Sequence, residues 1–240
     1  AIAFTASANN TGADTLNGGL GDDTYSFSIG DGNDTINEAV NATSGGVADR
    51  ISILAPNAVD AAGVPIIDPV TGLPTPTLTA LNAVDNGGGT AAGDLVINYS
   101  LPSSATTSVA QTITVAGHFA GGNAQTGVER INFNGATYAG YLLGADDYLI
   151  SRADTAGDRV VDLTVSTANN FVAGENNTDD VITGGSANDL IFGVEKAQIV
   201  ANLRTIVQAA KANQTIPIVG TLTPTFPWHD FIANEIVALN

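Results

Sequence analysis

Hydrophobic residues follow two different periods along this chain, and the change falls near residue 193. Before that point, short apolar runs alternate with Thr, Ser and Asn, a period of two that predicts β-strands. The clearest of these runs are residues 49–54, 94–99, 112–115 and 127–133. Asn134-Gly135 predicts a hairpin turn from the last run to residues 136–138. Two Pro/Ala/Thr-rich segments, 55–80 and 101–108, predict long loops.

After Gly193 the apolar positions fall on one stripe of a helix. They are residues 199, 200, 203, 206, 207 and 210, and this spacing is the α-helical one. A short β-branched run, residues 216–220, and a second helix beginning near Asp230 follow. Helix, strand and helix in succession predict a small α/β segment at residues 194–240.

A nine-residue repeat near the N-terminus is the most specific feature of the sequence. Residues 9–17 align with residues 18–26, so that Gly12, Asp14, Thr15 and Leu16 correspond to Gly21, Asp23, Thr24 and Tyr25. The second unit matches the pattern G-G-x-G-x-D-x-U-x, where U is a large apolar residue. Residues 32–36 repeat its second half two positions later than strict register. Further matches recur at residues 180–182 and 184–192.

The repeat has a direct chemical interpretation. Nine residues provide one turn and one short strand, so two units predict one coil of a parallel β-roll. The glycines allow positive φ in the turn, the Asp adds a carboxylate, and the apolar residue fills the core. Stacked turns would offer many oxygens, which suits the roughly six to eight oxygen ligands of calcium. Without an ion the same carboxylates repel one another, so folding should depend on calcium.

Composition and charge agree with acidic turns and exclude several classes of partner. The net charge is −17, from 24 acidic and 7 basic residues, and 19 of the acids are Asp, a residue suited to turns and oxygen-ligand sites. Nucleic acids and anionic membranes require a basic face and are excluded. No apolar run reaches the roughly 18 residues of a membrane span.

The absence of cysteine excludes disulfides and zinc–thiolate sites. Because the chain does not begin with Met, we expect a processed form or a fragment.

Together these repeats resemble the RTX, or haemolysin-type calcium-binding, family. The resemblance covers residues 9–36 and, more loosely, residues 49–138 and 180–192, and it is clearest from Gly18 to Glu38. It implies a secreted bacterial protein, extracellular or at the cell surface, that binds Ca2+. The expected fold is mainly β, with parallel β-roll calcium repeats and additional strands, followed by the smaller C-terminal α/β segment. The expected divisions are calcium repeats at 1–38, a β-rich module with long loops at 39–140, a second RTX-like β segment at 141–193 and the α/β segment at 194–240.

The residues expected to hold calcium are the acids and glycines of the repeats. Carboxylates would come from Asp14, Asp23, Asp34, Asp180 and Asp189, and carbonyl oxygens from Gly19 and Gly21. Besides calcium ions, the expected partner is the remainder of a larger parent polypeptide. The module would stabilise or present that polypeptide once it has folded.

The C-terminal part has a second resemblance, to SGNH (GDSL-type) hydrolases over residues 185–240. Asn188 before Asp189 resembles the G-x-N-D motif that supplies an oxyanion-hole Asn, although Ser186 replaces its Gly. No Gly-Asp-Ser sequence supplies a nucleophile, and neither His118 nor His229 lies in a D-x-x-H pattern. An esterase needs a nucleophile, a base and an oxyanion hole together. We therefore expect no esterase activity from this chain alone.

Three functions stay open on the sequence. The first is a calcium-binding extracellular module that folds on binding the ion. The second is a fragment of a secreted SGNH-like ester hydrolase, in which the RTX repeats serve export and folding. The third is an adhesin or surface-layer segment, which the Thr/Ala/Gly-rich loops would suit. Residues 184–192 fit both an RTX turn and the hydrolase motif.

Overall fold

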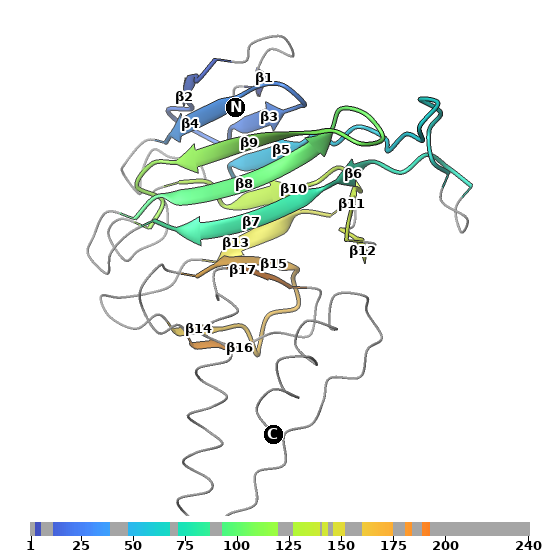
Figure 1. Cartoon of the computed structure of the whole chain (residues 1–240). Helices are drawn as coiled ribbons and strands as arrows, with labels where there is room; N and C mark the ends of the chain where they lie inside the picture. The colour runs from blue at the N-terminus through green and yellow to red at the C-terminus, as the bar shows by residue number, and fades with distance from the viewer. Residues whose placement is uncertain are drawn as a thin grey trace, which may run out of the picture. The chain divides into compact units, whose positions relative to one another are not determined.

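The computed structural model of the chain contains β-strands and no helix among its described residues. These residues are 3–5, 12–38, 48–67, 72–86, 93–119, 127–139, 141–143, 146–151, 160–174, 181–183 and 189–192. The chain divides into Ala1–Gly193 and Val194–Asn240, and every described residue belongs to the first unit. The expectation of a mainly β protein is confirmed (Figure 1). The α/β segment expected at 194–240 lies outside the described residues.

Two large sheets contain most of the strands (Figure 1). The seven-stranded sheet has the order β1 (Ala3–Thr5), β3 (Thr24–Phe27), β5 (Arg50–Ile53), β10 (Arg130–Asn132), β13 (Tyr148–Ser151), β15 (Asn170–Ala173) and β17 (Leu190–Phe192). The five-stranded sheet has the order β2 (Thr15–Asn17), β4 (Asn33–Asn37), β9 (Ser108–Val115), β8 (Leu95–Pro102) and β7 (Ala80–Asp85). The remaining strands form two small sheets, β12 (Tyr141–Leu142) with β11 (Thr137–Tyr138) and β6 (Thr77–Leu78), and β14 (Val160–Asp162) with β16 (Val181–Thr183).

Successive strands of the N-terminal part alternate between the two large sheets. The strands β1, β3 and β5 lie in the seven-stranded sheet, whereas β2 and β4 lie in the five-stranded sheet, and all neighbours among them pair in parallel. The nine-residue step from Thr15 to Thr24 therefore carries the chain from one sheet to the other. Thr15 then pairs with Thr35, which agrees with the register shift seen in the repeat.

A long segment separates β5 from β10, although these two strands are parallel neighbours with Arg50 opposite Arg130. It contains β7, β8 and β9, which pair antiparallel and extend the five-stranded sheet. Two expected loops were too long, because β6 lies within residues 55–80 and because only residues 103–107 connect β8 to β9. The sequence did not predict β7, since Asn and Ala occupy half of its positions and weaken the apolar alternation.

The turn expected at Asn134-Gly135 is present, but the hairpin is wrong. Both residues have positive φ, 52° and 68°, and the amide of Ala136 donates to the carbonyl of Phe133. The strand before the turn, β10, pairs with β5 and β13, whereas β11 after it pairs with β6 and β12. The turn thus redirects the chain from one sheet to another.

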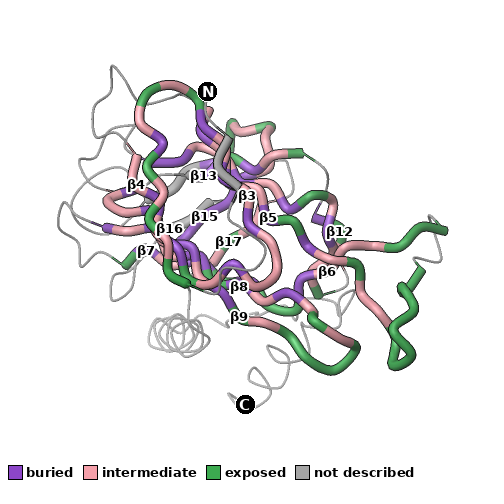
Figure 2. The backbone as a smooth tube through the Cα atoms, turned by 90° about the horizontal axis from the view of Figure 1, so that it is seen from above, coloured by how far each residue is buried: buried purple, intermediate pink, exposed green. Residues whose placement is uncertain are grey.

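The core lies between the inward faces of the two large sheets, as the alternation predicts. Two of the apolar repeat residues, Tyr25 and Ile36, are fully buried, and Leu16 packs partly buried against the same cluster. The described residues 57–67 and 72–76 instead form an arm held by three isolated bridges. Its side chains are the most exposed part of the described chain (Figure 2), and they include Val64, Ile66, Ile67 and Leu73.

Candidate metal centre

Two Gly-x-Gly turns lead into the acidic repeat positions. Gly19 and Gly21 have φ values of 89° and 92°, and Gly30 and Gly32 have nearly the same values, 88° and 99°. Residues with a Cβ atom rarely adopt a positive φ, so the turns require glycine. The two turns have the same shape, and each places an Asp at the start of the strand that follows. These are Asp23 before β3 and Asp34 in β4.

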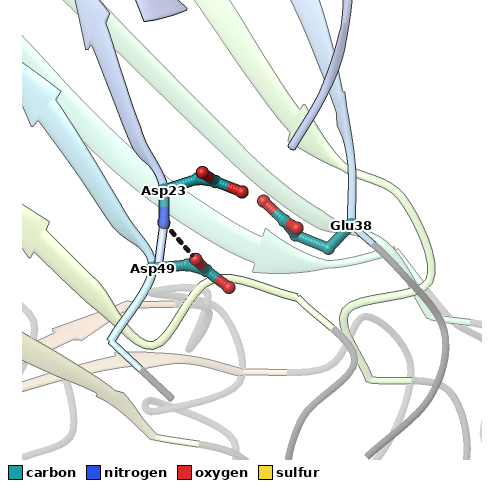
Figure 3. Close-up of side chains that lie close together, drawn as sticks. All are labelled: Asp23, Glu38 and Asp49. Atoms are coloured by element: carbon teal, nitrogen blue, oxygen red, sulfur yellow. Dashed lines mark hydrogen bonds between the residues drawn. The ribbon is translucent and has the colours of Figure 1, made fainter. Parts of the chain in front are cut away.

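Three carboxylates converge at one end of β3, β4 and β5. Asp23 precedes β3, Asp49 precedes β5, and Glu38 follows β4, so strands of both sheets contribute to this acidic cluster (Figure 3). One oxygen from each residue lies within 4.8 Å of one oxygen from each of the others. The amide of Asp23 donates to Oδ1 of Asp49 at 2.6 Å. Asp23 and Asp49 are both 1% exposed.

The residues around the acidic cluster are close-packed. A Cβ atom on Gly18 would lie 2.6 Å from Oε1 of Glu38 and 2.8 Å from Oδ2 of Asp23, so a side chain there would displace the carboxylates. The hydroxyl of Tyr25 donates to the carboxylate of Glu38. Burial raises the pKa of Tyr25 well above its usual range, and the hydrogen bond and charge of Glu38 raise it further. Tyr25 therefore stays protonated and acts as a donor.

Three carboxylates at this spacing are costly without a cation. Removal from water disfavours each charge, and like charges this close disfavour one another. A hard divalent cation relieves both costs, and an all-oxygen donor set is the one that calcium prefers. Among the described residues, this is the one group of three acids with ligand atoms so close together.

Acidic residues also pair along each sheet, in register at the strand starts. The amide of Asp14 donates to Asp34 at 2.9 Å, and the amide of Asp49 donates to Glu129 at 2.9 Å. The amide of Asn170 donates to Asp189 at 3.1 Å. Each carboxylate thus accepts the amide that opens the neighbouring strand. In this position an acid has a structural role even where it binds no ion.

Asp34 has a distinct environment on the side of the five-stranded sheet. It is 2% exposed, and its Oδ2 atom has no hydrogen-bond partner among the described residues. Burial raises the pKa of Asp34; the amide of Asp14 opposes this shift, whereas the charges of Asp14 and Asp31 add to it. Asp31 is itself buried and accepts the amide of Ser28 at 2.5 Å.

The buried side chain of Gln111 holds the turn that precedes Asp34. Its Nε2 donates to the carbonyl of Ser28 at 2.9 Å and to the hydroxyl of Tyr99 at 2.8 Å. Its Oε1 accepts the amide of Gly30 at 2.7 Å. The turn at residues 28–31 is therefore fixed by a strand that lies 81 residues further along the chain.

The structure brings together only part of the expected ligand set. Asp23 lies in the acidic cluster, and Gly19 and Gly21 form the turn before it, whereas Asp14 and Asp34 pair with each other outside that cluster. They are separate because Asp23 opens a strand of one sheet and Asp34 belongs to the other. Asp189 accepts the amide and side chain of Asn170. Asp180 lies outside the described residues.

Sequence reasoning missed two members of the acidic cluster, Asp49 and Glu38. Asp49-Arg50-Ile51 is itself a D-x-U half-repeat, and this signal could have identified Asp49. Glu38 carries no such signal, because it follows a strand rather than opening one. Its position depends on the two-sheet arrangement, which places the end of β4 beside the starts of β3 and β5 (Figure 3).

The residues considered for esterase chemistry gain no support. Ser186, Asn188 and His229 lie outside the described residues. His118 is fully buried, and its ring packs edge-on against Phe119 with centroids 4.6 Å apart, which is the environment of a core residue. Among the described residues, no helix has the length and apolar character needed to cross a membrane.

Comparisons with known proteins add no relative. No family model matches the chain, and neither a curated protein nor a solved structure matches it.

Proposed function

We propose that this chain is a calcium-binding module of the RTX type whose folding is coupled to Ca2+. The acidic cluster of Asp23, Glu38 and Asp49 carries the proposal. Its donors are all oxygens, two of the three carboxylates are buried, and its packing leaves no room for a side chain at Gly18. The alternation of parallel strands between two sheets supports a β-roll for the N-terminal coils.

The residues of the acidic cluster would hold the ion, and Tyr25 would orient Glu38 toward it. Bound calcium would supply positive charge to three neighbouring carboxylates, which offsets the cost of their burial. Because the ligands come from the ends of β3, β4 and β5, the ion would join strands of both sheets. The free energy of calcium binding would thereby add to the free energy of unfolding of the module.

A second calcium position is proposed at Asp34 with Asp14. The buried Oδ2 of Asp34 has no hydrogen-bond partner among the described residues, and the charge of Asp31 is close enough to raise its pKa. A cation there would lower the cost of keeping Asp34 ionised. This second position uses repeat acids of the five-stranded sheet, whereas the acidic cluster combines Asp23 and Asp49 of the seven-stranded sheet with Glu38, which follows β4.

The proposed setting is the outside of a bacterial cell, within a larger secreted polypeptide. Extracellular calcium modules bind with Kd values of about 10⁻⁴ to 10⁻³ M. A module of this affinity would be less stable at low calcium and would gain stability where calcium is abundant. It would then stabilise or present the rest of the parent polypeptide.

Calcium titration of the full chain tests the proposal. Isothermal calorimetry with CaCl2 should give a Kd in the range above, and chelation with EGTA should lower the melting temperature and the β content seen by circular dichroism. Calcium at about 100 times its Kd should raise the free energy of unfolding by about 2.7 kcal/mol. Unchanged melting and no binding heat would contradict the proposal.

Substitutions locate the ion. Asp49→Asn keeps the oxygen that accepts the amide of Asp23 but removes the charge, so it should weaken calcium binding at least tenfold while the chain still folds. Asp23→Ala should do the same. The matched control is Asp146→Asn, at an exposed acid outside the acidic cluster. If all three variants bind calcium equally well, the ion lies elsewhere.

A further inference from the structure

The solvent face of the five-stranded sheet is uncharged, in a chain whose net charge is −17. Its solvent-facing positions, in strands that are described throughout, carry only Thr, Asn, Ser, Ala, Val or Pro. The two acids in these strands, Asp34 and Asp85, face inward and are buried. In the seven-stranded sheet, by contrast, Arg50 and Arg130 are partly exposed and pair with Asp147. The neutral face is therefore a local property of one sheet.

A shallow groove of about 350 Å³ crosses this neutral face over β7, β8, β9 and the start of β4, strands that lie side by side in Figure 1. Its size is at the lower end of the roughly 300–1,000 Å³ of small-ligand sites. Small residues form its floor, because Ala80 pairs with Ser100 and Ser100 with Ala110 across the strands. Tyr138 lines the groove from outside the sheet.

One row of polar side chains runs along the groove at right angles to the strands. Asn82 pairs with Asn98, Asn98 with Thr112, and Thr112 with Asn33. Neighbouring strands lie about 4.8 Å apart, so an amide or a hydroxyl recurs at that interval. The hydroxyl of Thr112 donates to Oδ1 of Asn98 at 3.0 Å, which orients the Asn98 amide group. Asn82, Asn98 and Asn33 are exposed.

This chemistry selects a ligand rich in hydroxyl groups and without charge. Amide groups both donate and accept hydrogen bonds, and Tyr138, which packs partly buried against the core and whose hydroxyl donates to the carbonyl of Leu81, borders the groove. A cation would prefer the carboxylates elsewhere in the chain, and an anion would be repelled by the net charge. We propose that this groove binds a neutral polysaccharide, with Asn82 and Asn98 as its main hydrogen-bonding residues. The proposal does not rest on calcium binding.

Binding of neutral oligosaccharides to the full chain tests this inference. The probes are cellohexaose, maltohexaose, mannohexaose and N-acetylchitohexaose, titrated by calorimetry in CaCl2 buffer with folding verified by circular dichroism. At least one probe should bind, and Asn82→Ala with Asn98→Ala should weaken that binding at least about tenfold, as expected for the loss of two hydrogen-bonding groups. The matched control, Asn17→Ala, lies on the same face outside the groove and should bind as the parent does.

Three outcomes would overturn the proposal. The first is that none of the four probes binds to the folded protein. The second is that a probe binds but the double variant retains full affinity. The third is that the parent forms dimers in sedimentation experiments and the double variant does not, which would assign the neutral face to a second copy of the chain. A calcium-independent fold that still binds a probe would support the groove while contradicting the calcium proposal, so the two can fail separately.

Discussion

Tyr25 connects the hydrophobic core to the acidic cluster. Its ring is fully buried in the core between the sheets, and its hydroxyl donates to Glu38. The pKa of Tyr25 is raised mainly by burial, so the hydroxyl keeps its proton at neutral pH. A single residue at the apolar position of the repeat thus has both a packing role and a polar one.

Tyr25→Phe tests the polar role at the residue scale. The variant keeps the ring and loses a hydrogen bond to a charged group, which contributes about 1.5–3 kcal/mol. We expect the free energy of unfolding in urea to fall by about that amount and calcium affinity to fall with it. Tyr148→Phe is the matched control, because its buried hydroxyl donates to the carbonyl of Leu143, which is not part of the acidic cluster. Equal effects in the two variants would argue against a role for Tyr25 in the acidic cluster.

The pKa of Asp34 makes a pH-dependent prediction for the calcium-free protein. Because burial raises its pKa in the folded state above the usual 3.8, its contribution to stability is complete below that value and is lost as the pH rises through the folded-state pKa. The Asp34→Asn side chain cannot ionise, so the variant avoids this loss of stability, and its amide oxygen can still accept the amide of Asp14. In EGTA, the variant should therefore be more stable than the parent at pH 7, with the difference shrinking toward pH 4.

Urea unfolding of both proteins at several pH values measures the effect of Asp34→Asn. Saturating calcium should reverse its sign at neutral pH, because the parent would then gain the binding energy that the variant lacks. A variant that is less stable than the parent at pH 7 in EGTA would contradict this prediction. It would show that the folded protein already stabilises the ionised carboxylate of Asp34 in the absence of an ion.

At the scale of elements, Gln111 makes one turn depend on a distant strand. Gln111→Leu preserves volume but removes three hydrogen bonds from the buried turn at residues 28–31 and from Tyr99. Because each buried polar group left without a partner costs about 1–3 kcal/mol, we expect a loss of at least about 3 kcal/mol. Hydrogen exchange at the amide of Gly30 should accelerate. Thr112→Val, the adjacent residue on the opposite face, should change stability by less than about 0.5 kcal/mol; a comparable loss there would point to general damage to β9.

The elements differ in how far the sequence predicts them. The alternating runs at β5, β8, β9 and β10 are strands as expected. One face of each strand packs on the core, and the alternation of apolar and polar residues therefore indicates which face is buried. The Gly-x-Gly turns were predictable because the required φ restricts the residue type. Glu38 and Gln111 could not be assigned, since their partners are fixed by contacts between segments far apart in the sequence. The pairing of β11 was missed for the same reason: a turn sequence specifies local geometry and not the sheet that receives the next strand.

At the scale of the whole described unit, the seven-stranded sheet contains strands from residue 3 to residue 192. The strands β1, β3 and β5 and the later strands β13, β15 and β17 belong to the same seven-stranded sheet. Asp23 and Asp49 open strands of this sheet and Glu38 follows a strand of the five-stranded sheet, so hydrogen-bonded pairing connects the acidic cluster to the strands of both large sheets. Stabilisation by an ion at the acidic cluster should consequently extend to both large sheets rather than to the N-terminal coils alone.

The long segment between β5 and β10 has a consequence for the order of folding. Pairing β3 with β5 closes a loop of 26 residues, as measured from Asp23 to Asp49, whereas pairing β5 with β10 closes one of 80, from Asp49 to Glu129. The entropic cost of closure grows with the logarithm of loop length, so the second step costs about 1 kcal/mol more than the first. The N-terminal coils should form early and then act as a template to which β10 is added. In a chain that emerges N-terminus first, whether from a ribosome or across a membrane, that template is available before β10 has arrived.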